Sequence, residues 1–132
     1  MNKRFTKDEK LKHKKLIAQL FKEGKTITKY PIQLVYLKLA HHGKFPIKAG
    51  FSVTKKKFKC AVDRNLIKRR MREVYRLNKY YIYSLLNDKY IFMFIYLDSE
   101  IQSSKSIHLK MEQLLKKFME TIKLIIPPKL GQ

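Results

Sequence analysis

The stretch that decides the fold is Val62-Asp63-Arg64-Asn65-Leu66-Ile67-Lys68-Arg69-Arg70-Met71-Arg72. Counted at about 100° per residue as a helix, it has two unlike sides. The cationic arc holds Arg64, Lys68, Arg72, Arg76 and Lys79, flanked by Asn65 and Arg69. The opposite arc is apolar and holds Ile67, Met71, Val74 and Leu77, with Arg70 lying towards it. We expect the apolar arc to pack on a sheet and the cationic arc to face a polyanion.

The limits of this helix follow from its flanking residues. Asp63 is a suitable N-cap, and Asn78 can end the helix because asparagine tolerates the left-handed conformation of a helix terminus. The arginines favour bidentate contacts to phosphate, because the guanidinium fork matches two oxygens and stays charged.

The charge around this helix is almost entirely of one sign. Residues 55–72 contain one acid, Asp63, and nine cations: Lys55, Lys56, Lys57, Lys59, Arg64, Lys68, Arg69, Arg70 and Arg72. The whole chain has 31 Lys and Arg against 10 Asp and Glu, a formal net charge of +21. A solvated charged face would alternate its signs, so this density predicts binding of nucleic acid or of an acidic membrane surface.

Length and composition bound the class of protein. A chain of 132 residues that is 45% hydrophobic suits one globular domain. The single cysteine, Cys60, excludes an intrachain disulfide, and the longest apolar run, residues 90–97, is far shorter than the roughly 18 residues of a spanning helix. The charged N-terminus does not resemble a signal peptide. We therefore expect a soluble, reduced, cytoplasmic protein.

Hydrophobic patterning predicts the remaining elements. Residues 10–23 have helical spacing and end at Gly24, and residues 31–39 alternate as a strand in which Ile32, Leu34 and Tyr36 share a face. After a turn at residues 41–46, residues 47–53 resume the extended pattern. These two strands are expected to form an antiparallel pair.

The C-terminal part predicts a central strand and a last helix. Residues 90–97 are apolar throughout, which is typical of a strand buried on both faces. Ser103 or Ser104 can open a helix that Pro127-Pro128 would end. Its apolar stripe consists of Ile107, Met111, Leu114, Leu115, Phe118 and Ile122. One α+β domain, with short flexible ends outside about residues 4–126, is the simplest organisation.

The order of several short motifs resembles a known family. Arg64-Asn65, then Lys68-Arg69 and Arg72, is similar to the signature helix of the bacterial ribonuclease P protein component. Matching segments before the helix are Leu20-Phe21-Lys22-Glu23-Gly24, Leu34-Val35-Tyr36, Gly50-Phe51-Ser52-Val53 with Lys55-Lys56, and Ala61-Val62. The resemblance covers roughly residues 4–120. Leu66 and Ile17 depart from it, since the family has an arginine and commonly an aromatic residue at these positions.

The resemblance implies a fold and a function. The fold would be a single α+β domain of order αβββαβα, with the signature helix in a left-handed βαβ crossover and a further short strand within residues 24–53. The function would be that of the protein subunit of ribonuclease P, in which a catalytic partner RNA uses Mg²⁺ to remove the 5′ leader of precursor tRNA. The protein itself would bind no cofactor and supply no catalytic residue.

The resemblance also assigns site residues. Contacts to the partner RNA would come from the basic helix region: Arg64, Asn65, Lys68, Arg69, Arg72 and Arg76, with Lys55 and Lys56. The single-stranded leader would lie in a cleft between the first helix and the sheet, lined by Ile17, Phe21 and Tyr36 with Lys55 and Lys56 at its rim. Aromatic rings beside cations suit sequence-tolerant binding of single strands. From their spacing alone, Phe21 and Tyr36 would instead be ordinary core residues.

No independent active site is predicted. The acids are few and mostly isolated. Asp98 with Glu100, after the apolar strand, is the nearest candidate for a catalytic pair, and a loop after a strand explains these two acids equally well. His41-His42 fits a solvated turn, and Cys60 has no recognisable base beside it.

Three alternatives share the basic composition. A ribosome-associated RNA-binding protein would bind structured RNA without a preference for a tRNA leader. A peripheral membrane protein needs a large apolar helix face left after sheet packing, which the basic helix lacks. A self-sufficient nuclease needs clustered carboxylates. We expect no membrane and no DNA partner.

Overall fold

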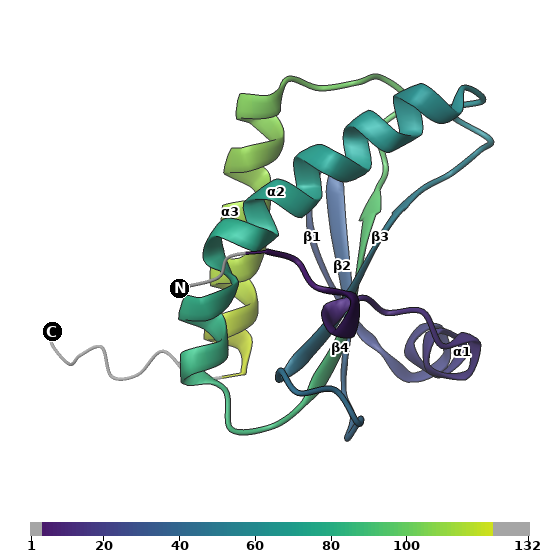
Figure 1. Ribbon diagram of the computed structural model, residues 1–132. Helices are drawn as coiled ribbons and strands as arrows, with labels where there is room; N and C mark the ends of the chain where they lie inside the picture. The colour runs from purple at the N-terminus through teal and green to yellow at the C-terminus, as the bar shows by residue number, and fades with distance from the viewer. Residues whose placement is uncertain (1–3, 123–132) are drawn as a thin grey trace, which may run out of the picture.

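The structure is a computed structural model that describes residues 4–122. These residues form one sheet with helices on both faces (Figure 1). In chain order the elements are η1 (Lys7–Glu9), α1 (Lys14–Glu23), β1 (Lys25–Lys29), β2 (Ile32–Lys38), β3 (Ile47–Val53), α2 (Ala61–Leu85), β4 (Tyr90–Tyr96) and α3 (Ser104–Thr121). This confirms the αβββαβα order, and β1 is the additional short strand. The predicted helix stop at Pro127-Pro128 lies outside the described residues.

The sheet has the strand order β1-β2-β4-β3. The prediction that β2 and β3 form an antiparallel pair is wrong, because β4 lies between them, antiparallel to β2 and parallel to β3. The apolar run that forms β4 fits this central place, because helices cover the middle of the sheet on both faces and six of the seven β4 side chains are buried. The central position of β4 is thus confirmed, and α2 connects the parallel pair. The handedness of this crossover stays a prediction.

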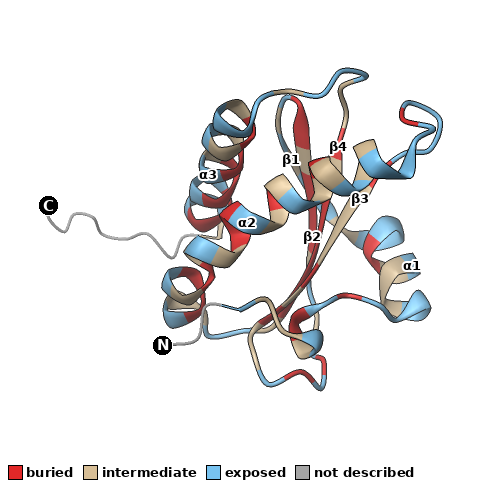
Figure 2. Cartoon of the chain, turned by 45° about the horizontal axis from the view of Figure 1, so that its top comes forward, coloured by how far each residue is buried: buried red, intermediate tan, exposed pale blue. Residues whose placement is uncertain are grey.

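The two faces of the sheet are covered unequally. Figure 1 shows α2 and α3 together on one face and α1 on the other. The larger core lies under α2 and α3, and Figure 2 shows the buried sides of these helices turned to the sheet. The smaller core consists of Leu11, Leu20, Val35, Ile91 and Met93, beneath α1. The α1 face is therefore the face on which part of the sheet stays accessible.

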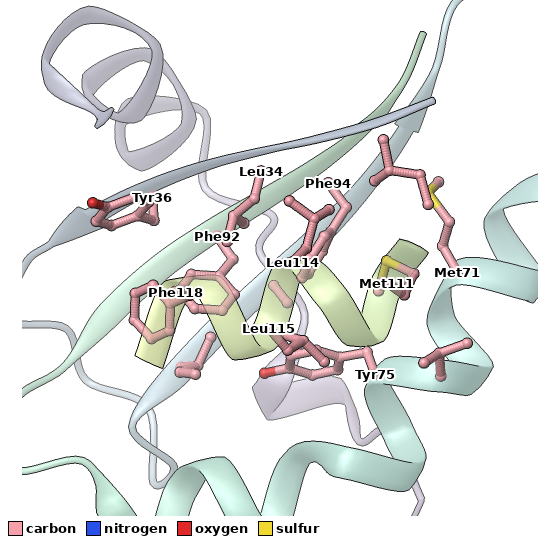
Figure 3. Close-up of a cluster of buried hydrophobic side chains, with 14 of the residues drawn as sticks. Leu34, Tyr36, Met71, Tyr75, Phe92, Phe94, Met111, Leu114, Leu115 and Phe118 are labelled. Carbon is pink, nitrogen blue, oxygen red and sulfur yellow. The ribbon is translucent and has the colours of Figure 1, made fainter. Parts of the chain in front are cut away.

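Aromatic packing holds α3 to the sheet. The ring of Phe118 meets those of Tyr36 and Phe92 edge to face, with centroids 5.2 and 4.8 Å apart (Figure 3). It meets the Tyr90 ring in the same way at 5.2 Å. Such pairs add to the stabilisation that burial provides. Ser103 caps α3 by accepting a hydrogen bond from the Ser106 amide at 3.1 Å, as the serine pair in the sequence predicts.

The boundaries of the first two helices differ from the prediction. α1 begins at Lys14 and not at residue 10, because Lys10 and Leu11 are extended and pair with Ala49, the Leu11 amide donating to the Ala49 carbonyl at 3.0 Å. α2 begins after Cys60, so Asp63 lies in its first turn and is not the N-cap. Asn78 does not end α2, since its side-chain amide donates to the Val74 carbonyl inside the helix at 2.8 Å. The buried Ile82 and Tyr83 continue the apolar stripe towards Leu85.

Candidate nucleic-acid interface

The outward face of α2 is rotated relative to the predicted cationic arc. Asn65 and Arg69 are exposed, whereas Arg64, Lys68, Arg72 and Arg76 are half-buried along the flank of the helix. The buried stripe consists of Ile67, Met71, Val74, Tyr75, Lys79, Ile82 and Tyr83. Leu77, predicted in the apolar arc, is 44% exposed and lies outside the core. The six predicted RNA-binding residues of the helix still occupy one continuous side.

Two arginines of this side are positioned by their neighbours. Arg64 Nη1 donates to the carbonyls of Phe58 and Lys59, at 2.7 and 3.0 Å, and so ties the preceding loop to the start of α2. The Arg72 guanidinium carbon lies 5.8 Å from the centre of the Phe51 ring, a cation–π contact. Both side chains are thereby oriented before any ligand binds.

Arg76 and Arg70 have protein partners. Arg76 forms a two-pronged pair with Glu73, with Nη2–Oε2 at 2.7 Å and Nε–Oε1 at 3.2 Å, and this hydrogen bonding holds the pKa of Glu73 below its usual value. Arg70 donates to the Gln102 carbonyl at 2.7 Å, which joins α2 to the loop before α3. Arg70 thus lies towards the protein, as predicted, whereas the Nε and Nη2 groups of Arg76 are held by Glu73 and would have to leave it to bind a phosphate.

Lys79 is not part of the cationic face. Its ammonium group is fully buried and contacts both carboxylate oxygens of Glu9, at 2.7 and 2.9 Å. Tyr83 also donates to Glu9, and Tyr75 hydrogen-bonds with Tyr83. The prediction that Lys79 belongs to the cationic arc rested on its helical angle alone. The N-terminal segment instead places the buried carboxylate of Glu9 against the Lys79 ammonium group. The residues of this network had no local sequence signal, since Glu9 and Lys79 are 70 positions apart.

The loop between β3 and α2 adds further cations. Lys55 and Lys56 are exposed in the turn that follows Val53, and Lys57 donates to the Leu97 carbonyl from the same turn. Because β3 and β4 are parallel, this loop lies at the C-terminal end of β4 and beside the start of α2. The loop and the helix therefore form one positively charged surface.

An accessible row of side chains crosses the α1 face of the sheet. Strand pairing aligns Thr28 with Gln33, Gln33 with Ile95, and Ile95 with Ser52. Thr28 is exposed and the other three are half-buried. The row runs from β1 to β3, one residue from the strand end that leads to Lys55. This row thus presents an apolar centre and hydrogen-bonding groups next to cations. Side chains alternate between the two faces of a strand, and this alternation is the sequence signal that could have revealed the row.

The predicted cleft residues are only partly brought together. Ile17 and Phe21 lie four residues apart on one flank of α1, with Ile17 half-buried against the smaller core and Phe21 53% exposed. Tyr36 lies on the opposite face of the sheet, 6% exposed and packed on Phe118 (Figure 3). The prediction that Tyr36 lines the cleft is wrong. Side chains of β2 alternate between the two faces of the sheet, and Ile32, Leu34 and Tyr36 point to the face that α3 covers. Val35 and Leu37 face α1 instead.

The carboxylates and histidines have structural surroundings. Asp98 accepts hydrogen bonds from the Gln102 side chain and from the backbone of Ser99 and Glu100, which lowers its pKa. His41 is buried, not solvated as predicted, and it accepts from the Gly43 amide. Among residues 4–122, no three His, Cys, Asp or Glu side chains are placed to hold a metal ion. In the same part of the chain, no helix is long and apolar enough to cross a membrane.

Sequence comparisons match this chain to known proteins. The family model Ribonuclease P matches residues 5–119. The ribonuclease P protein component of Porphyromonas gingivalis is 33% identical over 113 residues, covering 83% of this chain and 82% of that protein. That of Dictyoglomus turgidum is 40% identical over 78 residues, covering 59% and 62%.

Solved structures agree with the fold. The RNase P protein of Thermotoga maritima superposes with a TM-score of 0.66 at 25% identity, covering 83% of this chain and 96% of that one. The RNase P protein of Staphylococcus aureus superposes with a TM-score of 0.69 at 22% identity, covering 83% and 94%. With the αβββαβα order, the basic α2 and a family match over almost all described residues, this chain belongs to the bacterial ribonuclease P protein family.

Proposed function

We propose that this protein is the RNA-binding subunit of ribonuclease P and binds both the catalytic RNA and the 5′ leader of precursor tRNA. The observation that carries the proposal is the continuous cationic surface of α2 and the loop before it, within a chain of net charge +21. The catalytic RNA binds this surface through its phosphates. The protein supplies no side chain to the hydrolysis.

The leader binds on the α1 face of the sheet in this proposal. The row Thr28, Gln33, Ile95 and Ser52 offers hydrogen bonds and an apolar centre to unpaired bases, and Lys55 and Lys56 at its end attract the backbone. Phe21, exposed on the flank of α1, supplies an aromatic ring for stacking. No residue of the Tyr36 face takes part.

Mg²⁺ belongs to the RNA in this proposal. Folded RNA repels itself and needs divalent cations, and a protein of charge +21 replaces part of that requirement. We therefore expect the subunit to allow cleavage at lower Mg²⁺ concentration, in the cytoplasm where precursor tRNA is made.

Reconstitution of the holoenzyme tests the function. Labelled precursor tRNA is incubated at low Mg²⁺ with a bacterial ribonuclease P RNA, with and without the protein, and with the protein alone. Efficient cleavage at the mature 5′ end by the combination alone supports the proposal. If the protein does not increase cleavage by a folded cognate RNA, a ribosome-associated RNA-binding role explains the basic surface better. Cleavage by the protein alone would indicate a nuclease.

The cationic surface has its own test. The triple variant Arg64→Ala, Lys68→Ala and Arg72→Ala should bind ribonuclease P RNA more weakly and flatten the salt dependence of binding by up to about one unit of slope per lost phosphate contact. Lys105, Lys116 and Lys117, exposed on α3, provide a control of equal charge change when replaced by alanine. An unchanged slope in the α2 variant, or an equal loss in the α3 variant, would contradict the assignment of this surface.

A further inference from the structure

An apolar spot interrupts the most basic part of the surface. Val62 and Leu66 lie one helical turn apart at the start of α2, and Val62 is 73% exposed. Together with Asn65, Arg69 and Arg72 they line an open hollow of about 450 Å³. Aliphatic side chains gain little from a phosphate, whose oxygens need donors or cations. The hollow therefore has a composition that phosphate binding does not explain.

We propose that this hollow binds an unpaired nucleobase of the partner RNA. The flat face of a base would cover Val62 and Leu66 and remove their side chains from water. The Asn65 amide and the guanidinium groups of Arg69 and Arg72 would donate to the edge of the base and to the phosphates beside it. This inference rests on the proposed function and specifies one contact of the basic helix as a base contact.

Charge complementarity favours RNA over a protein partner at this hollow. Two of its five lining residues are arginines and none is an acid. Glu73, one turn beyond Arg69, is paired with Arg76 and so offers no free carboxylate to a basic partner. A regular duplex would present phosphates but no accessible base face to two aliphatic side chains. An unstacked base in a loop or bulge satisfies both the apolar and the cationic parts.

The salt dependence of binding separates a base contact from a phosphate contact. Leu66→Ala and Val62→Ala should each weaken binding of a ribonuclease P RNA transcript by at least about fivefold, with the slope against salt unchanged. Arg72→Ala should weaken binding and also lower the slope by about one. Leu109→Ala on α3, which removes another exposed leucine, is the matched control and should leave binding unchanged.

Chemical footprinting identifies the base. One unpaired base should be protected from a base-modifying reagent by the wild-type protein and become reactive with Leu66→Ala, while protection of the backbone around it persists. Binding by Leu66→Ala equal to wild type, or a loss of affinity that changes the slope, would overturn the base contact. Circular dichroism establishes that each variant is folded. If wild-type protein itself neither binds the transcript nor supports cleavage, the proposed function fails instead.

Discussion

At the scale of single residues, the buried pair of Glu9 and Lys79 links the N-terminal segment to α2. Both side chains are fully buried, and Thr6 donates to Glu9 from its backbone amide at 2.8 Å. Burial by itself would raise the pKa of Glu9, but hydrogen bonds from Lys79, Thr6 and Tyr83 hold it below the usual value. The ionised form of Glu9 is stable in the protein interior only because these partners compensate for the water that it has lost.

Removing one partner of this pair should destabilise the fold strongly. Lys79→Met leaves an unpaired buried carboxylate and should lower the free energy of unfolding by roughly 3–5 kcal/mol. The double variant Glu9→Gln with Lys79→Met should regain most of this loss, because no buried charge remains. Urea unfolding of the wild type, Glu9→Gln, Lys79→Met and the double variant measures the coupling free energy between the two side chains. Additive losses would show that the pair is not coupled.

His41 should make the stability depend on pH. Burial lowers its pKa below 6.5, and nearby Lys89 and Lys48 act in the same direction. Since the unfolded chain then binds more protons, the stabilisation is complete above pH 6.5 and is lost as pH falls through the lowered folded pKa. Thermal melts between pH 7.5 and 5 measure this loss. His41→Gln, which keeps polar atoms in place but cannot titrate, should show a flatter profile over that range.

At the scale of elements, α2 combines two roles along its length. Its first half carries the exposed Asn65 and Arg69, while its second half buries Tyr75, Lys79 and Ile82 against the sheet and η1. The second half therefore fixes the angle at which the first half is presented. α3 supports the same face of the sheet through Phe118 and begins with a serine cap.

The α3 cap should contribute measurably to stability. Ser103→Ala removes the acceptor of the Ser106 amide and should lower the free energy of unfolding by about 1 kcal/mol. Ser104→Ala, one residue later, is the control and should change it much less, because Ser104 is exposed at the first helical position. Chemical denaturation of both variants gives the comparison. Equal effects would mean that the cap bond contributes nothing.

At the scale of the whole molecule, the sheet separates the larger core from the accessible α1 face. Tyr36 and Phe21 are therefore different kinds of residue although both were predicted for the leader cleft. One stabilises the fold and the other is available to ligands.

Substitutions at these two positions should distinguish the two faces. Phe21→Ala should leave the unfolding free energy within about 0.5 kcal/mol and weaken leader-dependent binding of precursor tRNA to the holoenzyme by at least about fivefold. Tyr36→Phe, which keeps the buried ring, should leave that binding unchanged. Affinities for precursor tRNA with and without its leader provide the measurement. A leader-dependent loss in Tyr36→Phe alone would reverse the assignment of the faces.

Local patterns in the sequence were sufficient for much of this protein. The spacing of apolar residues predicted β2, β3, β4, α3 and most of α1, and the density of Lys and Arg at residues 55–72 predicted the cationic surface. These features depend on neighbours within a few residues, so they can be read along the chain. The family resemblance supplied β1 and the overall order of elements.

Only the tertiary structure decided which elements meet. The insertion of β4 between β2 and β3, the burial of Lys79 against Glu9 and the place of Tyr36 under α3 all depend on residues far apart in sequence. Helical angle and strand parity specify that two side chains share a face, but not what covers that face. The partner across each face is chosen by packing of the whole chain, because burial is gained only when complementary surfaces come together.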